Sequence, residues 1–206
     1  MELTEKQIQI LQVAERLFAE NGFDGTSVRQ IAREAGINVA MISYYFGSKE
    51  NLLSALLLHR TADFKIQIES VLSEEIGFLE KADAVIALTI ARVHRNRRMY
   101  KIIHFEYSHL SRKANFATYI ERKKENFSII ESFIKDGQAA GIFTKDLNIP
   151  LIIPTILGTY FNFYYNKKFF QAMHDLQEET SIDEYVFNVL TPHIQKTIKA
   201  LLTYED

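Results

Sequence analysis

The sequence of 206 residues contains no cysteine, only three prolines and only eight glycines. Without cysteine, the chain has no disulfide bridge and no thiol to bind a metal or act as a nucleophile, which suits a reducing cytoplasm. With so few turn-forming residues, a sheet-rich fold of many short strands is disfavoured. The segments between the glycines and prolines instead carry apolar residues at helical spacing, so we predict an all-α fold.

An excess of positive charge is also lacking. The formal net charge is -2 at pH 7, which argues against a protein that coats DNA through a basic surface. The first 50 residues, with five basic and seven acidic side chains, have the same net charge. Between residues 26 and 49, however, Arg29, Arg33 and Lys49 are accompanied by a single acid, Glu34. Any interaction with DNA must therefore depend on the positions of these cations rather than on total charge.

One stretch has no charged residue at all: residues 147–166, LNIPLIIPTILGTYFNFYYN. About twenty uncharged residues is the length of a membrane-spanning helix. Its two prolines, its asparagines and its many tyrosines argue against a span, so we expect a helix buried in the core or in a subunit interface, without membrane contact. The first residues, MELTEKQIQI, do not follow the pattern of a secretory signal, and we expect a cytoplasmic protein.

The first 47 residues predict three short helices separated by glycines. They are expected at residues 4–21, 27–35 and 38–46. The expected N-caps are Thr4 for the first, Thr26 or Ser27 for the second and Asn38 for the third. A long fourth helix, capped by Ser48, is predicted to continue to residue 72.

The remainder of the chain predicts longer amphipathic helices near residues 81–96, 97–110, 114–140, 149–173 and 183–202. Pro154 and Pro192 are expected to kink the helices that contain them. Because short helices give way to long ones near residue 47, we predict an N-terminal domain of residues 1–47 and a larger helical domain of residues 48–206.

The second and third short helices, with Gly36 between them, have the layout of a helix-turn-helix. At 100° per residue, Met41, Ile42 and Tyr45 lie on one side of the third helix, where they can pack on the other helices. The opposite side, which would face DNA, carries Val39, Ala40, Ser43 and Tyr44.

The segment from about Ile8 to Leu53 closely resembles the DNA-binding domain of the TetR family of bacterial transcriptional repressors. The resemblance lies in AERLFAENGFDGTSVRQIAREAG and ISYYFGSKENLL, in which many characteristic positions are correctly spaced. It implies an all-α homodimer with an N-terminal three-helix DNA-binding domain and a larger C-terminal domain for ligand binding and dimerisation. It further implies that a small-molecule inducer releases the repressor from a double-stranded, pseudo-palindromic operator.

The resemblance also assigns residues to the DNA. Thr26 and Ser27 fall where the family contacts phosphates, and Lys49 where the family commonly has a phosphate-binding Lys. The complete predicted DNA-binding set is Thr26, Ser27, Arg29, Asn38, Val39, Ala40, Ser43, Tyr44, Tyr45 and Lys49.

This chain departs from the family pattern within the recognition helix. Val39 stands where members often have Lys, Ser43 where they often have Tyr, and Tyr45 where they often have His. Phosphate binding is therefore expected from Lys49, Arg29, hydroxyl groups and helix N-termini. Base recognition is expected from Asn38, Ser43 and Tyr44, together with apolar contacts from Val39 or Ala40 to thymine methyl groups.

Several of these residues have simpler interpretations. Tyr44 and Tyr45 are alternatively core aromatics, and Asn38 is a helix cap before it is a base reader. Arg33 is interpreted as a solvated residue or as an ion-pair partner of an acid in the first helix.

The C-terminal region gives weaker signals. Its aromatic residues are ordinary core or line an apolar ligand cavity, and the candidate ligand-binding residues are Phe64, Tyr100, Phe105, Phe127, Tyr160 and Tyr164. The basic stretch ARVHRNRRMYK, residues 91–101, is a solvated helix junction or an anion site. His104 and His109 are five residues apart, which does not place them on one helical face, so no metal site is predicted.

We find no phosphate-binding glycine loop, nucleophile elbow or paired catalytic carboxylates, and we predict neither a cofactor nor an enzymatic activity. The sequence thus favours a ligand-responsive DNA-binding regulator that acts as a homodimer. The alternative is an α-helical small-molecule-binding protein or enzyme with an incidental helix-turn-helix.

Overall fold

The computed structural model describes residues 3–108, 117–174, 176 and 179–204. The regular elements in these residues are all helical, which confirms the predicted all-α class. By contacts, the chain divides into two compact units: residues 1–64 with 96–125, and residues 65–95 with 126–206. The units are therefore not consecutive in sequence and do not separate at residue 47. The predicted boundary at residue 47 separates a DNA-binding domain from a ligand-binding and dimerisation domain by function, and this assignment remains a proposal.

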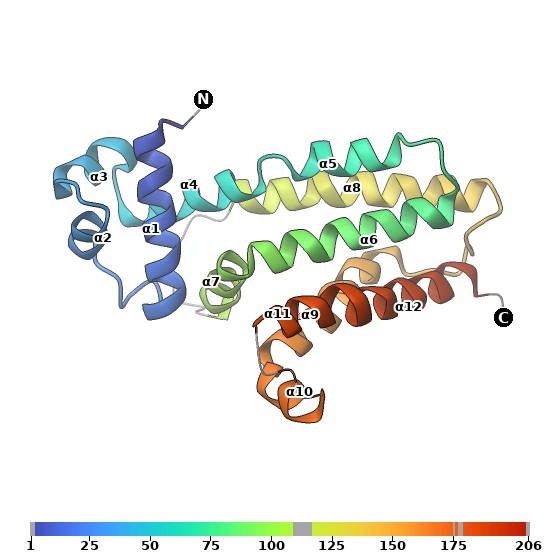
Figure 1. The fold of residues 1–206 in the computed structure, drawn as a ribbon. Coiled ribbons are helices and arrows are strands. Elements are labelled where there is room, and N and C mark those ends of the chain that lie inside the picture. Colours follow the sequence, from blue (N-terminus) through green and yellow to red (C-terminus); the bar gives the residue numbers. More distant parts are fainter. Residues whose placement is uncertain (1–2, 109–116, 175, 177–178, 205–206) are drawn as a thin grey trace. The chain divides into compact units, whose positions relative to one another are not determined.

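The first unit begins with four helices: α1 (Glu5–Asn21), α2 (Val28–Glu34), α3 (Val39–Phe46) and α4 (Lys49–Thr61) (Figure 1). It also contains α7 (Arg97–Ser108) and the first residues of α8 (Ala117–Ala139). The predicted caps are confirmed for all four N-terminal helices. Thr4 forms a capping box with Gln7, and Ser27, Asn38 and Ser48 each accept a hydrogen bond from a backbone N–H in the first turn.

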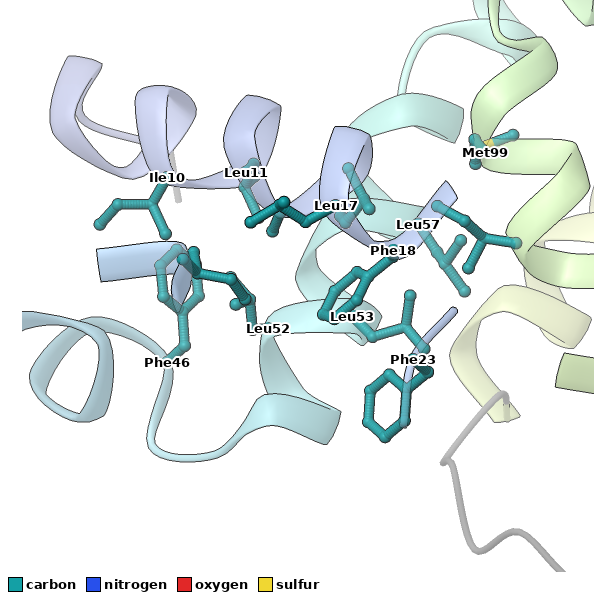
Figure 2. Packing of buried hydrophobic residues seen from close by; sticks show 14 of the residues in the cluster. Ile10, Leu11, Leu17, Phe18, Phe23, Phe46, Leu52, Leu53, Leu57 and Met99 are labelled. Carbon is teal, nitrogen blue, oxygen red and sulfur yellow. The ribbon is translucent and has the colours of Figure 1, made fainter. Parts of the chain in front are cut away.

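One face of α1 forms the centre of the first unit's core. Ile10, Leu11, Leu17 and Phe18 are almost fully buried (Figure 2). These side chains belong to one apolar cluster with residues of α2, α3, α4 and α7, among them Ile31, Phe46, Leu52, Leu53 and Met99. The positions of α2 and α3 are thus determined by burial against α1 and α4.

The second unit contains α5 (Phe64–Leu72, of which Phe64 itself groups with the first unit), α6 (Phe78–Arg95) and the rest of α8. After these come α9 (Ile149–Tyr165), α10 (Lys167–His174), α11 (Glu179–Tyr185), the π-helical turn η1 (Val186–Leu190) and α12 (Thr191–Thr203). Helices α6 and α12 lie side by side (Figure 1). Lys199 of α12 donates to Asp83 of α6 over 2.6 Å and extends this packing with an ion pair.

Two predicted long helices are wrong because each is interrupted in the structure. The predicted helix of residues 48–72 is divided into α4 and α5 by Ala62 and Asp63, and the predicted helix of residues 149–173 is divided into α9 and α10 at Asn166. Neither break contains proline or glycine, the strongest local signals for the end of a helix.

A π-helical turn, η1, lies just before Pro192, with only Thr191 between them, where a kink was predicted. Proline has no N–H to offer to the carbonyl four residues earlier. The chain accommodates this with a wider turn, in which both the N–H and the hydroxyl of Thr191 donate to the carbonyl of Val186. The helical path of α11 therefore continues into α12.

None of the helices in the described part of the chain has the length and apolar character needed to cross a bilayer.

An ion pair between α1 and α4 gives a stability prediction. Glu15 is buried, and Arg60 donates to its Oε2 through two nitrogens, with the Nε contact at 2.9 Å. Arg60→Leu should lower the free energy of unfolding by about 3 kcal/mol, because it leaves the buried Glu15 carboxylate without its partner. Urea denaturation followed by circular dichroism measures this change.

The double variant Glu15→Leu/Arg60→Leu should recover most of the loss, because no uncompensated charge then remains buried. Lys65→Leu is the control, since Lys65 and Glu69 form an exposed pair at 4.0 Å and this variant should have almost no effect. Equal losses in the Arg60 and Lys65 variants would contradict the role assigned to the buried pair.

Candidate nucleic-acid interface

The turn between α2 and α3 has the backbone conformation that a helix-turn-helix requires. Gly36 has φ of 63°, in the left-handed region that favours glycine. The Gly36 N–H donates to the carbonyl of Arg33, and the Ile37 N–H donates to that of Ala32. These bonds end α2 tightly and allow α3 to begin only a few residues later.

The burial pattern of α3 confirms the two faces predicted from its periodicity. Ile42 and Phe46 are buried against the core, while Met41 and Tyr45 are half-buried. On the other face, the exposed residues are Val39, Ala40, Ser43 and Tyr44, with Asn38 exposed at the N-cap. The exposed face of this helix therefore has no formal charge.

Tyr44 projects into solvent from α3. Its exposed fraction is 80%, so its alternative interpretation as a core aromatic is wrong. Tyr45 is half-buried and packs on the apolar cluster, and its ring meets that of Tyr44 edge-on with centroids 5.2 Å apart. The two adjacent tyrosines thus differ in role: Tyr45 packs on the domain, and Tyr44 is free to reach a partner.

Asn38 acts as a cap in the way that the simpler interpretation predicts. Its Oδ1 accepts a hydrogen bond of 2.9 Å from the N–H of Ala40. The side-chain NH₂ group is not used in this cap, and the residue is exposed. The structure therefore makes Asn38 a cap whose amide donors face solvent.

The two residues predicted to contact phosphates at the start of α2 differ in their exposure to solvent. Ser27 is exposed, and its hydroxyl accepts from the N–H of Gln30. Thr26 is fully buried, and its hydroxyl lies within hydrogen-bond distance of the carbonyls of Leu17 and Gly22. The expectation that the Thr26 side chain contacts a phosphate is therefore corrected, because this hydroxyl is enclosed within the fold.

Lys49 is also bound within the protein. Its Nζ donates to the carbonyl of Phe23 over 2.9 Å and to that of Thr26 over 3.0 Å. The same ammonium lies 4.2 Å from the centroid of the Phe23 ring. The residue at the beginning of α4 is thus tied to the loop that precedes α2.

The local charge of the interface is set by a pair between α1 and α2. Arg16 donates to the Glu34 carboxylate, and this hydrogen bond holds the pKa of Glu34 below its ordinary value. The ion pair thus joins Arg16 to Glu34, rather than Arg33 to an acid of the first helix as one interpretation held. Arg29 and Arg33 are both exposed on α2. The single acid between residues 26 and 49 is therefore neutralised, and the two arginines leave this surface positive.

Comparison with known proteins identifies the kind of protein that carries this interface. Residues 10–56 match the family of bacterial regulatory proteins named tetR. The chain is 32% identical over 142 residues to the transcriptional repressor NicS of Pseudomonas putida, and the aligned region covers 68% of this chain and 66% of that relative. It is 26% identical over 151 residues to the transcriptional repressor KstR2 of Mycolicibacterium smegmatis, and the aligned region covers 73% of this chain and 74% of that relative. The chain belongs to the TetR family.

The fold agrees with this assignment. A solved structure of the transcriptional regulator FadR from Bacillus subtilis, in complex with stearoyl-CoA, superimposes with a TM-score of 0.71 at 21% identity and covers 95% of this chain and 98% of that one. As a member of the TetR family, the chain is a DNA-binding transcriptional regulator. Its named relatives are transcriptional repressors.

The six aromatic residues predicted to bind a ligand in this TetR-family chain are divided between the two units. Phe64, Tyr100 and Phe105 belong to the first unit, and Phe127, Tyr160 and Tyr164 to the second. Tyr100 packs beside the core of the first unit, and Phe105 is half-exposed. Phe64, Phe127 and Tyr164 are half-buried. The six residues therefore remain separate candidates rather than the wall of one described cavity.

Tyr160 has a structural role that the sequence did not reveal. Its side chain is fully buried, and its hydroxyl lies 2.9 Å from Nδ1 of His94. Nε2 of the same histidine lies 2.7 Å from Asp183 Oδ1. This chain of polar groups connects α6, α9 and α11 and gives the Tyr160 hydroxyl a partner inside the fold, while its role in ligand binding stays a prediction. The three residues are too distant in sequence for any spacing rule to associate them.

A pocket of about 590 Å³ opens within the second unit, and none of the six predicted aromatic residues is part of its lining. Its lining includes Gly158, Asn162 and Phe163 of α9, Phe170 of α10, Tyr185 of α11 and His193 of α12.

His104 is exposed, and His109 lies outside the described residues. In the described part of the chain, no group of three or more potential ligand side chains is arranged to hold a metal ion.

The exposed position of Tyr44 predicts its contribution to DNA binding. Tyr44→Ala should weaken binding to the preferred duplex by about tenfold, because the side chain offers both a hydroxyl and an aromatic edge to the groove. Fluorescence anisotropy of labelled duplex measures the dissociation constant. Tyr204→Ala, which removes another exposed tyrosine outside this unit, is the matched control and should bind as the wild type does. Wild-type affinity in the Tyr44 variant would exclude this face of α3 from the interface.

Proposed function

We propose that this TetR-family chain is a cytoplasmic repressor that binds a pseudo-palindromic operator as a homodimer and releases it when a small molecule binds. The observation that carries the proposal is the exposed face of α3, which is uncharged and offers Tyr44 to solvent while the opposite face is buried in the core. Such a helix suits the major groove, where hydrogen-bonding groups and methyl groups distinguish the bases.

Within residues 1–47, the proposal assigns separate tasks to the exposed residues. Arg29 on α2 and Ser27 at its N-cap bind phosphates, because a cation and a hydroxyl next to the recognition helix are suited to position it on the DNA backbone. Asn38, Ser43 and Tyr44 contact base edges, and Val39 and Ala40 contact thymine methyl groups. Since only a few cations take part, the affinity should depend less on salt than that of a strongly basic DNA-binding protein.

We propose that α9 and α12 form the dimer interface. Helix α9 has no charged residue, yet its Leu151 and Tyr165 are substantially exposed, as is Leu201 of α12. Two such helices from each copy would form a four-helix interface, in which the same patch of each subunit meets itself. The partner would cover the pocket beside Gly158. Two copies of α3 would then occupy successive major grooves, about 34–36 Å apart.

Gly158 allows the interface to be tested without disturbing the fold of a single copy. A Cβ atom at this position would meet no atom within 4 Å, so a side chain fits in an isolated subunit. Gly158→Glu should convert the dimer into a monomer at about 10 µM, because dimerisation would bury an unpaired charge. Sedimentation velocity measures the change, and Gly158→Ala, which should remain dimeric, is the control. A dimeric Gly158→Glu protein would place the interface elsewhere.

The inducer is proposed to be a molecule with a long acyl chain. The support is the likeness in fold to FadR, whose structure contains stearoyl-CoA, and the aromatic content of the C-terminal helices. Apolar and aromatic side chains with a few polar groups are the usual lining of such sites.

Two experiments, carried out one after the other, test the proposed repressor function. Selection from a random duplex pool should yield a pseudo-palindromic sequence with half-sites one helical turn apart. Stearoyl-CoA should then reduce the affinity for this duplex, whereas free coenzyme A, the control, should not. Failure to select any sequence would contradict the proposed repressor, and selection without an effect of stearoyl-CoA would contradict only the proposed inducer.

A further inference from the structure

Lys49 occupies an unusual position for a cation in a DNA-binding unit. It is the first residue of α4 and is half-buried, and its ammonium donates to the carbonyls of Phe23 and Thr26. Lysine has three N–H donors, so two of them are satisfied within the protein. The Phe23 ring beneath the ammonium adds a cation–π contact at 4.2 Å.

The loop that receives Lys49 is itself firmly connected to α1. The Phe23 ring is buried and packs on that of Phe18, with centroids 5.3 Å apart. The Thr26 hydroxyl reaches the carbonyls of Leu17 and Gly22. The next residue, Ser27, is the N-cap of α2. The ammonium therefore binds the segment that determines where α2 begins.

Lys49 also lies directly after the recognition helix. Helix α3 ends at Phe46, and only Gly47 and Ser48 separate it from Lys49. The two hydrogen bonds consequently close a ring that runs from the loop through α2, the Gly36 turn and α3, and then back to the loop. The angle between α2 and α3 is constrained at both ends: at Gly36 by the backbone and at Lys49 by a side chain.

We propose that Lys49 is a positioning residue that fixes the recognition helix for specific DNA binding, rather than the supplier of a phosphate contact. Moving the ammonium to a phosphate would break charge-assisted hydrogen bonds and leave two carbonyls of the loop without this donor. The inference rests on the proposed DNA-binding function and assigns the residue that maintains its geometry.

The salt dependence of binding distinguishes positioning from phosphate contact. Each phosphate contact contributes about 0.9 to the slope of log K against log salt concentration. Lys49→Met removes the ammonium and keeps an unbranched apolar side chain of similar length. It should weaken binding to the selected duplex about tenfold, while the salt slope and the affinity for a scrambled duplex of equal length stay unchanged.

Arg29→Met is the matched control, because Arg29 is exposed on α2 and is proposed to bind a phosphate. It should lower the slope by about one and weaken binding to the selected and scrambled duplexes by similar factors. A slope reduced by about one in the Lys49 variant, with equal loss on both duplexes, would overturn the positioning role. The positioning role would also be overturned if Lys49→Met bound both duplexes as the wild type does. The same conclusion would follow if folded Lys49→Met kept the wild-type ratio of affinities for the selected and scrambled duplexes.

The wild-type protein provides a test that does not depend on the stability of a variant. In ¹⁵N-lysine-labelled protein without DNA, the Lys49 ammonium should give a resolved ¹H–¹⁵N signal, because its protons are hydrogen-bonded and exchange slowly. The signal is assigned by its absence from the spectrum of Lys49→Met. If Lys49→Met does not fold, Phe23→Leu assigns the signal instead, because loss of the ring should change the chemical shift of the Lys49 ammonium. Appearance of the signal only after addition of the selected duplex would favour a phosphate contact. If wild-type protein selects no duplex, the repressor proposal fails, whereas this signal still reports on the ammonium.

Discussion

The burial of one apolar face of α1 is the interaction on which the nucleic-acid interface depends. Helices α2 and α3 are seven and eight residues long, and isolated helices of this length are unstable in water. They persist because Ile31, Ile42 and Phe46 complete a core that is centred on α1 and α4. The outward face of α3 is then free to carry residues suited to recognition, since its inward face provides the packing that stabilises it.

A second principle concerns the use of cations in the first unit. Lys49 and Lys101 donate to backbone carbonyls, Lys101 to that of Ala19 in the last turn of α1. Arg122 likewise reaches the carbonyl of Leu58 in the last turn of α4. Cations at the C-terminal ends of helices satisfy carbonyls that lack an intrahelical partner and interact favourably with the helix dipole. Counts of basic residues therefore overstate the number of cationic groups in this unit that can make direct contacts with DNA phosphates.

The sequence predicted those features that are determined locally. The four N-terminal caps, the turn at Gly36 and the two faces of α3 follow from residue type and from periodicity over a few turns. The breaks at Ala62 and Asn166 were missed because neither contains the proline or glycine that marks other helix ends in this chain. The burial of Thr26, the binding of Lys49 to the loop and the contacts of His94 with Tyr160 and Asp183 depend on residues brought together by folding. No spacing rule connects such residues.

The three crossings of the chain between the two units, after residues 64, 95 and 125, have a consequence for protein engineering. Met99, Ile102 and Tyr119 belong to the same core as α1 and α4, although they lie far along the chain from the recognition helix. A fragment that stops after α4 would expose the apolar surface that these residues cover. A chimaeric regulator that borrows this DNA specificity therefore needs residues 96–125 in addition to the first 64, so the transferable module is discontinuous in sequence.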